Sequence, residues 1–580
     1  MQIATRPVDL SGSDFSDQLD PLLQRIYQSR GVTNQQQLER RLSCLPQPRL
    51  MSGIATASSR LVTALQCQQS VLILGDFDAD GATSSALMVL ALRAMGFDRV
   101  NFLVPNRFDY GYGLTPEIVE LAAEGFPDLI ITVDNGISSV AGVARANELG
   151  IEVIVTDHHL PGDQLPDAVA IVNPNQQGCE FPTKNLAGVG VAFYLLCALR
   201  AELRELQWFD KQKMAEPDMS QWLDLVALGT VADVVPLDQI NRALVHQGLM
   251  RIRAGYSRPG IQALLRIAGK APHSLVAADL GFALGPRLNA AGRLDDISLG
   301  IQCLLTDDPQ QALHLAQALD ELNQDRKHIE AGMQREALAI VDQLSMDTEA
   351  MPAALCLFQS DWHQGVVGLL ASRIKEKYHR PVVAFAPGDD GQLKGSSRSI
   401  PGLHIRDALD AVATQYPGLI SKFGGHAMAA GLSLDRDNLA QFTQAFQQQV
   451  ENSLSPDDLQ AKLVTDGCLQ PEQLNMPTAQ LLRDAGPWGQ LFPEPSFEGD
   501  FTIVQQRIVG EHHLKLQLAP HNQPDLVIDA IWFNVDTARW PNQNAGTVRC
   551  VFRLDINEYR GVEKIQLLVQ HIQQSDNYKN

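Results

Sequence analysis

The chain has 580 residues, of which 45% are hydrophobic and 19% charged, so it is an ordinary globular protein too long for one core. It contains no run of about 18 apolar residues and no apolar N-terminal segment, which argues against a membrane span and a signal peptide. The eight cysteines form no C-x-x-C pair, which argues against a disulfide framework and predicts a cytoplasmic location. The net charge of −21 argues against a general nucleic-acid coat protein, although a local basic groove remains compatible with it.

Residues 1–48 are predicted to form an N-terminal helical arm. Apolar residues between positions 22 and 27 have helical spacing, and Gly31 fits the end of that helix. The arm carries no evident catalytic group, so we expect it to serve in packing.

Residues 49–308 are predicted to form an α/β domain with a parallel, doubly wound sheet, because strand patterns alternate with helical patterns. In such sheets the ligand site lies at the carboxyl ends of the strands. The predicted strands are Val71–Leu74, Val100–Val104, Leu129–Val133, Ile151–Val155 and Ala168–Val172.

Three carboxylates follow the first of these strands, in the stretch VLILGDFDADG. Asp76, Asp78 and Asp80 would repel one another unless a cation lay between them, and oxygen ligands suit Mg²⁺ or Mn²⁺. The alternative is a solvated acidic turn that caps the next helix.

Further polar residues are expected at the same edge of the sheet: Asp134 in VDNG, His158 and His159 in TDHH, and Asp233 in GTVADVVPL. Adjacent histidines point in different directions, so one is expected to bind a given ion and the other to contact substrate or a carboxylate. The set exceeds the needs of one ion and suits two ions about 3.5–4 Å apart, bridged by one carboxylate. We predict that Asp134 is the bridge and that the reaction is hydrolysis of a phosphoester or pyrophosphate.

Arginines and an amide follow in GPRLNAAGRL. Arg287, Asn289 and Arg293 suit phosphate oxygens, because guanidinium groups bind them through two hydrogen bonds. Neutralisation of the carboxylates by the two arginines is the other interpretation, and the two are compatible.

Residues 309–345 have the spacing of one long amphipathic helix, which either connects two domains or packs on one. A second, smaller α/β domain is predicted over 346–452, with strands at Ala354–Phe358 and Val382–Phe385. Its glycine-rich loops let a ligand approach the backbone closely. Its candidate phosphate-binding residues are Arg373, Ser396, Ser397, Arg398 and His426.

Residues 453–580 show the period-two alternation of an antiparallel β domain, for example at Leu514, Leu516 and Leu518. A small barrel of the oligonucleotide-binding (OB) kind is one interpretation. Any small β domain that serves in packing is the other.

The motifs DFDADG, VDNG, TDHH and GTVADVVPL resemble those of the DHH phosphoesterase superfamily. Together with GPRLNAAGRL, WHQGVVG, GSSRS, FGGHAMAAG and GPWGQLFPEPSF, they resemble its RecJ family over nearly the whole chain. The resemblance implies a DHH domain, a DHH-associated domain joined to it by the long helix, and a C-terminal OB fold. It implies an exonuclease that degrades single-stranded DNA 5′→3′ to 5′-mononucleotides in recombination and repair, by a two-metal-ion mechanism.

The resemblance also assigns roles to residues and partners. Mn²⁺ or Mg²⁺, as two ions, would be held by Asp76, Asp78, Asp80, Asp134, His158 and Asp233. His159 and Arg287 would contact the substrate, and Ser396 and Arg398 would receive the 5′ end; Ser397 stands where some relatives have glycine. Single-strand-binding protein and a RecQ-type helicase are implied partners, and a cytoplasmic monomer without membrane contact is expected.

Two alternatives remain. One, within the superfamily, is a phosphoesterase for nanoRNA, pyrophosphate or cyclic dinucleotides, against which the length of the chain and its β domain argue. The other is a non-catalytic DHH-like replication scaffold, against which the complete set of ligand motifs argues.

Overall fold

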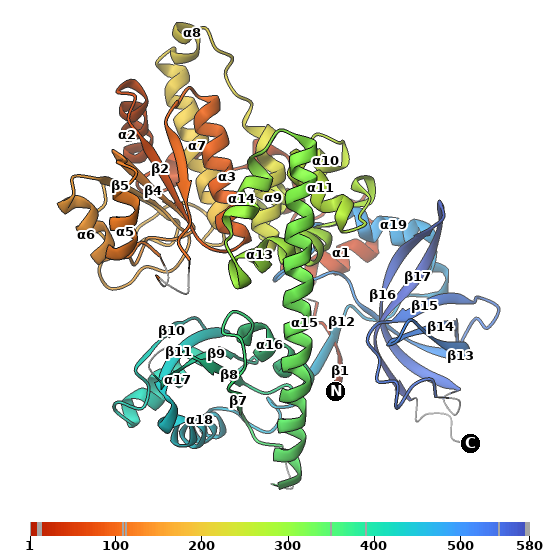
Figure 1. Cartoon of the computed structure of the whole chain (residues 1–580). Helices are drawn as coiled ribbons and strands as arrows, with labels where there is room; N and C mark the ends of the chain where they lie inside the picture. The colour runs from red at the N-terminus through yellow and green to blue at the C-terminus, as the bar shows by residue number, and fades with distance from the viewer. Residues whose placement is uncertain are drawn as a thin grey trace. The chain divides into compact units, whose positions relative to one another are not determined.

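The computed structural model describes residues 2–8, 14–106, 110, 113–347, 351–388, 391–542 and 546–574 (Figure 1). The chain forms two compact units, which are described separately. One unit comprises residues 4–292, 296–319 and 464–580, and the other comprises residues 1–3, 293–295 and 320–463.

The larger unit contains a five-stranded sheet in the order β3-β2-β4-β5-β6, in which every pair of neighbours is parallel. This confirms the predicted doubly wound sheet. The order reverses between β2 and β4, and in open parallel sheets ligands bind at the carboxyl ends of the strands where the order reverses. The strands are β2 (Val71–Gly75), β3 (Val100–Leu103), β4 (Leu129–Val133), β5 (Glu152–Thr156) and β6 (Ala170–Val172).

Three helices form a buried layer with this sheet. α3 (Ala79–Ala94), α7 (Gly188–Glu205) and α9 (Leu223–Ala232) contact one another, and most residues of α3 and α9 are buried. A helix that is buried on most sides belongs to a core, so these three helices form the packed layer beside the acidic residues. The other helices here are α2 (Ile54–Gln66), α5 (Pro116–Ala123), α6 (Val140–Glu148), α8 (Trp208–Gln212), α10 (Gln239–Arg253), α11 (Pro259–Ile267), α12 (Ala277–Asp279), α13 (Gly285–Leu294) and α14 (Ser298–Leu305).

The C-terminal part of the same unit is a closed five-stranded barrel in the order β13-β14-β15-β17-β16. Its pairs are antiparallel except for β15 with β17, which are parallel, so the predicted barrel is confirmed with one parallel pair in it. The elements are α19 (Met476–Asp484), β13 (Phe497–Val509), β14 (His513–Pro520), β15 (Ile528–Trp532), β16 (Thr547–Tyr559) and β17 (Val562–Gln574).

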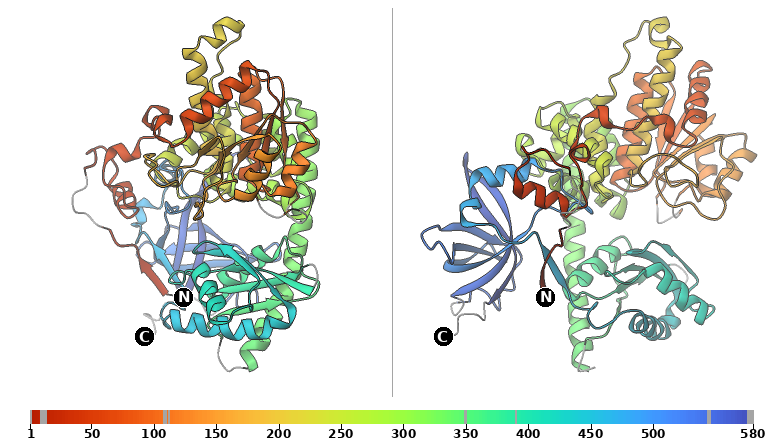
Figure 2. Two further views of the ribbon diagram at one scale, coloured as in Figure 1. Left: turned by 90° about the vertical axis from the view of Figure 1, so that its left-hand side faces the viewer. Right: turned by 180° about the vertical axis from the view of Figure 1, so that it is seen from behind.

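The N-terminal arm packs through its helix α1 (Pro21–Gln28), which lies beside α19 in both Figure 1 and Figure 2. The Tyr27 ring stacks at 6.0 Å from Trp488 and 6.1 Å from Phe492, and its hydroxyl donates to the carbonyl of Ala485 at 2.8 Å. The predicted packing role of this helix therefore agrees with its contacts. A short sheet pairs β1 (Gln2–Thr5) with β12 (Lys462–Thr465).

The smaller unit contains a sheet in the order β10-β11-β9-β8-β7, in which β7 and β8 are parallel and the other pairs antiparallel. The long helix α15 (Pro309–Asp347) contributes Met333, Ala337 and Val341 to the core on one face of this sheet. The remaining elements are β7 (Leu355–Phe358), α16 (Val367–Tyr378), β8 (Val382–Pro387), β9 (Gln392–Arg398), α17 (Ile405–Gln415), β10 (Lys422–Gly425), β11 (Ala429–Asp435) and α18 (Leu439–Ser453).

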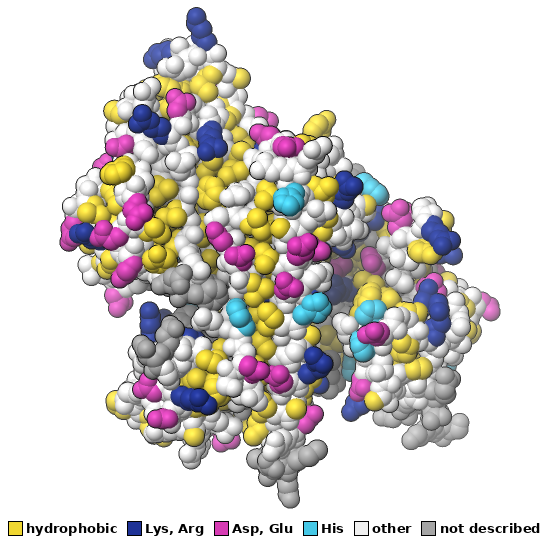
Figure 3. All heavy atoms as spheres, in the orientation of Figure 1, with side chains coloured by type: hydrophobic (Ala, Val, Ile, Leu, Met, Phe, Trp, Pro, Cys, Tyr) yellow, Lys and Arg dark blue, Asp and Glu magenta, His cyan; other side chains and the backbone are white. Residues whose placement is uncertain are grey.

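On the face shown in Figure 3, Lys and Arg side chains are interspersed with Asp and Glu side chains. Acidic side chains are therefore not gathered in one region of this face. Among the described residues, no helix is both long and apolar enough to cross a membrane.

Candidate metal centre and active site

The carboxyl ends of the strands bring the predicted metal ligands together. Their ligand atoms form three groups, in each of which all atoms lie within 4.8 Å of one another. The groups are Asp134 with His158 and His159, Asp80 with His158 and Asp233, and Asp76 with Asp78 and Asp134. The edge of the sheet at which the strand order reverses therefore carries overlapping sets of oxygen and imidazole ligands, the donor types that suit Mn²⁺ and Mg²⁺.

The acidic loop after β2 is held by backbone N–H groups. Asp78 caps α3, since its Oδ1 accepts from the N–H groups of Asp80 (2.9 Å) and Gly81 (3.1 Å). Asp80 accepts from Gly188 (2.6 Å) and Val189 (3.0 Å) at the N-terminus of α7. A helix N-terminus favours negative charge, so α7 both orients and stabilises this carboxylate.

Burial and mutual repulsion disfavour ionisation of the carboxylates. Burial, followed by the charge of Asp78, raises the pKa of Asp80 to about 7. Burial and the neighbouring carboxylates likewise raise the pKa of Asp134 and the pKa of Asp233 well above the usual range. A divalent cation among these groups would reverse the balance and favour their charged forms, so the cluster fits a metal ion.

Asp134 has a positive φ of 61°, although it is not a glycine. Such backbone conformations are costly and persist where the surrounding structure imposes them, frequently at functional sites. The conformation leaves Asp134 Oδ1 3.1 Å from Nε2 of His158, and Asp233 Oδ2 lies 3.4 Å from the same nitrogen. His158 therefore lies between two carboxylates, that of Asp134 after β4 and that of Asp233 after α9.

The second histidine is oriented by a buried carboxylate. Asp157 Oδ1 lies 2.7 Å from Nδ1 of His159 and also accepts from the N–H groups of His158 and His159, while its Oδ2 accepts from Ile137 at 2.9 Å. These contacts lower the pKa of Asp157 against the effect of its burial, and Asp157 in turn raises the pKa of His159 although burial opposes it. We expected one of the two adjacent histidines to contact substrate or a carboxylate, and His159 contacts the carboxylate of Asp157.

Helix α13 braces the acidic loop. The Asn289 Oδ1 accepts from the N–H of Ala79 at 2.7 Å, so this residue, predicted to bind phosphate, uses its oxygen on the loop. Gly292 packs so closely that a Cβ added there would lie 1.8 Å from the carbonyl oxygen of Phe77. Arg287, on the same helix, is buried and donates to the carbonyl of Ala283 at 2.6 Å.

The other predicted phosphate-binding residues belong to the smaller unit. In β9, Ser396 and Arg398 lie on one face, and Arg398 donates to Ser396 Oγ (3.1 Å) and Ser372 Oγ (3.2 Å). Ser397 is buried on the opposite face and donates to the carbonyl of Ala430 at 2.8 Å. The arrangement leaves Ser396 and Arg398 as the pair that shares a surface.

The three remaining residues that were predicted to bind phosphate also belong to the smaller unit. Arg293 donates to the carbonyl of Gly365 at 3.2 Å. Arg373 forms ion pairs with Glu330 (3.0 Å) and Glu376 (3.5 Å), so its charge is balanced within the unit. His426 lies between β10 and β11, where its N–H donates to the carbonyl of Ala429 at 2.8 Å.

Comparison with known proteins identifies the family. Family models match residues 70–230 (DHH family, N-terminal domain), 350–452 (DHHA1 domain) and 465–571 (RecJ OB domain). The single-stranded-DNA-specific exonuclease RecJ of Escherichia coli is 55% identical over 572 residues, which cover 99% of each chain. The chain belongs to the RecJ family. RecJ of Haemophilus influenzae is 51% identical over 558 residues, or 96% of each chain.

Solved RecJ structures share the fold. The structure of Thermus thermophilus RecJ in complex with Mn²⁺ matches with a TM-score of 0.77 and 30% identity, over 96% of this chain and 76% of that one. The Mg²⁺ complex of the same RecJ matches with a TM-score of 0.72 and 28% identity, over 96% and 75% of the two chains. The predicted fold class and resemblance are therefore confirmed, and the small-substrate and scaffold alternatives are not supported.

Sequence reasoning missed the small residues that let this RecJ-family centre close. A Cβ at Gly188 would lie 2.6 Å from Cβ of Asp134, and a Cβ at Gly229 would lie 2.8 Å from Asp80 Oδ1 and 2.2 Å from Thr83 Oγ1. Gly229 stands in GTVADVVPL, the motif noted for Asp233, and Gly188 stands in the apolar stretch LAGVG. Their signal is a glycine inside a predicted apolar helix, which is costly unless close packing requires it.

Proposed function

We propose that the chain hydrolyses single-stranded DNA from its 5′ end, 5′→3′, and releases 5′-mononucleotides in recombination and repair. The observation that carries the proposal is the cluster of five carboxylates and two histidines at the carboxyl edge of the sheet, in a chain of the RecJ family. The curated relatives of that family are named single-stranded-DNA-specific exonucleases.

The metal ions of the proposed reaction are Mn²⁺ or Mg²⁺, both of which are bound in structures of a RecJ relative. Asp76, Asp78, Asp80, Asp134, His158 and Asp233 would hold two ions. Asp134 and His158 each belong to two of the three groups, and Asp134 would be the shared ligand because a carboxylate has two oxygens to offer, whereas an imidazole nitrogen serves one ion. When bound, such ions lower the pKa of a water molecule and stabilise the leaving oxygen of a phosphodiester.

The chain's own residues orient the substrate. Asp157 fixes the ring of His159 through Nδ1, so the other ring nitrogen of His159 is the one available to a phosphate oxygen. Arg287 would offset charge that develops on the scissile phosphate. Ser396 and Arg398, which share one face of β9, would bind the 5′ end.

Matched oligonucleotides labelled at the 5′ or the 3′ end test the proposal. They are supplied as single strands and as blunt duplexes, with Mn²⁺, with Mg²⁺ or with a chelator. We expect early release of labelled mononucleotide from the 5′ label only, on single strands and only with metal. Asp134→Asn serves as the control, because asparagine tolerates a positive φ but removes the shared charge. Early release from the 3′ label, or digestion in chelator, would contradict the proposal.

We also propose a cytoplasmic monomer whose partners include single-strand-binding protein and a RecQ-type helicase. Family membership supports the partners, and sedimentation velocity with each purified protein tests them together with the oligomeric state. The proposed domain limits are 1–48, 49–308, 309–345, 346–452 and 453–580. The matches at 70–230, 350–452 and 465–571 support this division, which limited proteolysis tests.

A further inference from the structure

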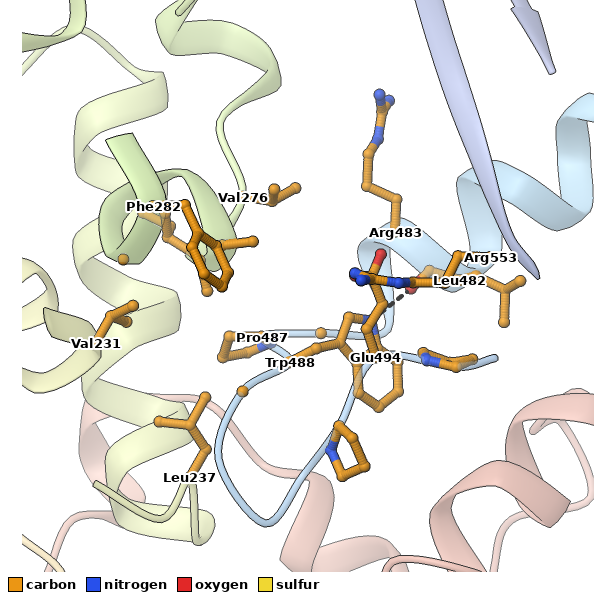
Figure 4. Close-up of a pocket in the computed structure, with 18 of the residues that line it drawn as sticks. Val231, Leu237, Val276, Phe282, Leu482, Arg483, Pro487, Trp488, Glu494 and Arg553 are labelled. Carbon is orange, nitrogen blue, oxygen red and sulfur yellow. Dashed lines mark hydrogen bonds and ion pairs between the residues drawn. The ribbon is translucent and has the colours of Figure 1, made fainter. Parts of the chain in front are cut away.

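A cavity of about 450 Å³ lies in the larger unit, between the helices beside the metal centre and the C-terminal barrel (Figure 4). This volume falls in the range of roughly 300–1,000 Å³ that is typical of ligand sites. On one side it is lined by Val231, Val234 and Phe282. On the other side lie Leu482 of α19, Trp488 and residues 553–555 of β16.

The cavity presents an aromatic ring to solvent. Phe282 is 86% exposed, and Figure 4 shows its ring projecting from its helical turn into the open space. This turn, Leu280–Leu284, is a π-helix, a rare form that occurs frequently at functional sites. Val234, beside it in the lining, is 60% exposed. Large apolar side chains that stay exposed around a cavity indicate a binding surface.

Charged groups around the cavity balance one another. Its lining contains Arg253, Arg483 and Arg553, but also Asp484, Glu494 and Asp555, and Arg553 forms an ion pair with Glu494. Arg253 donates to the carbonyl of Leu275, and Arg483 to the side chain of Gln480. A site for bare phosphate would require an excess of cations. The cavity instead suits a ligand that is flat, apolar on its faces and polar at its edge.

The cavity lies where a bound single strand would pass, between the metal centre and the barrel. Val234 directly follows the metal ligand Asp233, so their Cα atoms are about 3.8 Å apart. The opposite wall includes Leu554 and Gln570 from β16 and β17 of the barrel, which the RecJ OB domain model covers. A single strand held by both the metal centre and the barrel would pass this cavity.

We propose that the cavity is a stacking site for one base of the single-stranded DNA, with Phe282 as the ring on which the base stacks. The inference rests on the proposed function, since it requires single-stranded DNA as the substrate. Base–aromatic stacking tolerates any sequence, because every base has a flat face. The site would therefore hold the strand in register without selecting its sequence.

The test compares Phe282→Ala with Phe126→Ala. Phe126 is also 86% exposed but lies outside the cavity lining, so the two variants remove the same ring from equally accessible positions. Anisotropy with a labelled oligonucleotide in chelator gives Kd, and mononucleotide release with Mn²⁺ gives KM and kcat. We expect Phe282→Ala to raise Kd and KM about tenfold with kcat nearly unchanged, as loss of one stacked base predicts. Phe282→Trp and Phe126→Ala should stay within about twofold of the wild type.

A single abasic nucleotide, moved along the strand, identifies the stacked base. The wild type should bind more weakly when the abasic nucleotide stands at one particular position of the strand. In Phe282→Ala, an abasic nucleotide at that position should no longer weaken binding, and the effect of the other positions should be unchanged. An unchanged Kd in Phe282→Ala, or an equal loss in Phe126→Ala, would overturn the stacking site while wild-type digestion upholds the proposed function. Absence of any wild-type digestion of single strands would overturn the proposed function and this inference with it.

Discussion

Replacing Gly292 by alanine tests whether α13 holds the acidic loop after β2 in place. The added Cβ would lie 1.8 Å from the carbonyl oxygen of Phe77, and it must reach at least 3.0 Å, so the two groups must separate by about 1.2 Å. Because Phe77 stands between Asp76 and Asp78, that shift moves both carboxylates. A misplacement of about 1 Å costs on the order of 100-fold in rate. We therefore expect Gly292→Ala to lose about 100-fold in kcat and to bind Mn²⁺ more weakly.

Gly332→Ala in α15 is the matched control, because a Cβ there meets no atom within 4 Å. Removing a mid-helix glycine stabilises a protein by about 0.5–1 kcal/mol, so this variant should keep wild-type kcat and gain slightly in urea denaturation. In Gly292→Ala the gain from removing a mid-helix glycine is opposed by overpacking, which costs about 1–3 kcal/mol. The free energy of unfolding of this variant should therefore be lower than that of the wild type. Mononucleotide release, calorimetric titration with Mn²⁺ and urea denaturation measure these quantities. Wild-type kcat and Mn²⁺ affinity in Gly292→Ala would refute the bracing by α13.

Three further outcomes are expected. Asp134→Asn should lower kcat by more than about 100-fold and raise the melting temperature in chelator, because it removes one of several repelling buried carboxylates; scanning calorimetry and mononucleotide release measure both. The folded pKa of Asp80 is about 7, above the ordinary value of 3.8, so its ionisation costs metal-free stability as pH rises between these values; Mn²⁺ should therefore raise the melting temperature more at pH about 8 than at pH about 6. Burial, followed by Arg40 and Arg253, lowers the pKa of His246 to about 4 from 6.5, so stability should be lost as pH falls from 6.5 to about 4; urea denaturation should show a smaller loss in His246→Gln.

The sequence was sufficient to predict the sheet and the residues that gather at its edge. Parallel strands all end at one edge, so any polar residue that directly follows a strand is placed by the fold class alone. Asp76, Asp134 and His158 follow β2, β4 and β5 and lie together for this reason. Asp233 was also expected there, but it ends a helix rather than a strand, so the fold class alone does not place it.

The contacts between distant segments could not be predicted in the same way. Neither strand periodicity nor motif spacing indicates that Asn289 bonds to Ala79, because the two are 210 residues apart. From its chemistry alone, an amide beside two arginines is as well suited to binding phosphate as to accepting a hydrogen bond from a distant backbone N–H. Likewise, alternation in GSSRS predicts that Ser396 and Arg398 share a face, but the contacts of Ser397 in the core depend on the partner strand β11.

The charge of the chain and its substrate can be reconciled from these details. Part of the charge of −21 lies in the metal cluster, where burial raises pKa values and bound cations would offset the rest. Arg373 is already paired with Glu330 and Glu376, so its charge is not an unbalanced attraction for DNA. A polyanion can still be held if few phosphates are contacted and the remaining affinity comes from stacking, which charge hardly affects. The cavity beside Asp233, in which charged groups of opposite sign balance one another, suits binding by stacking rather than by contacts to phosphates.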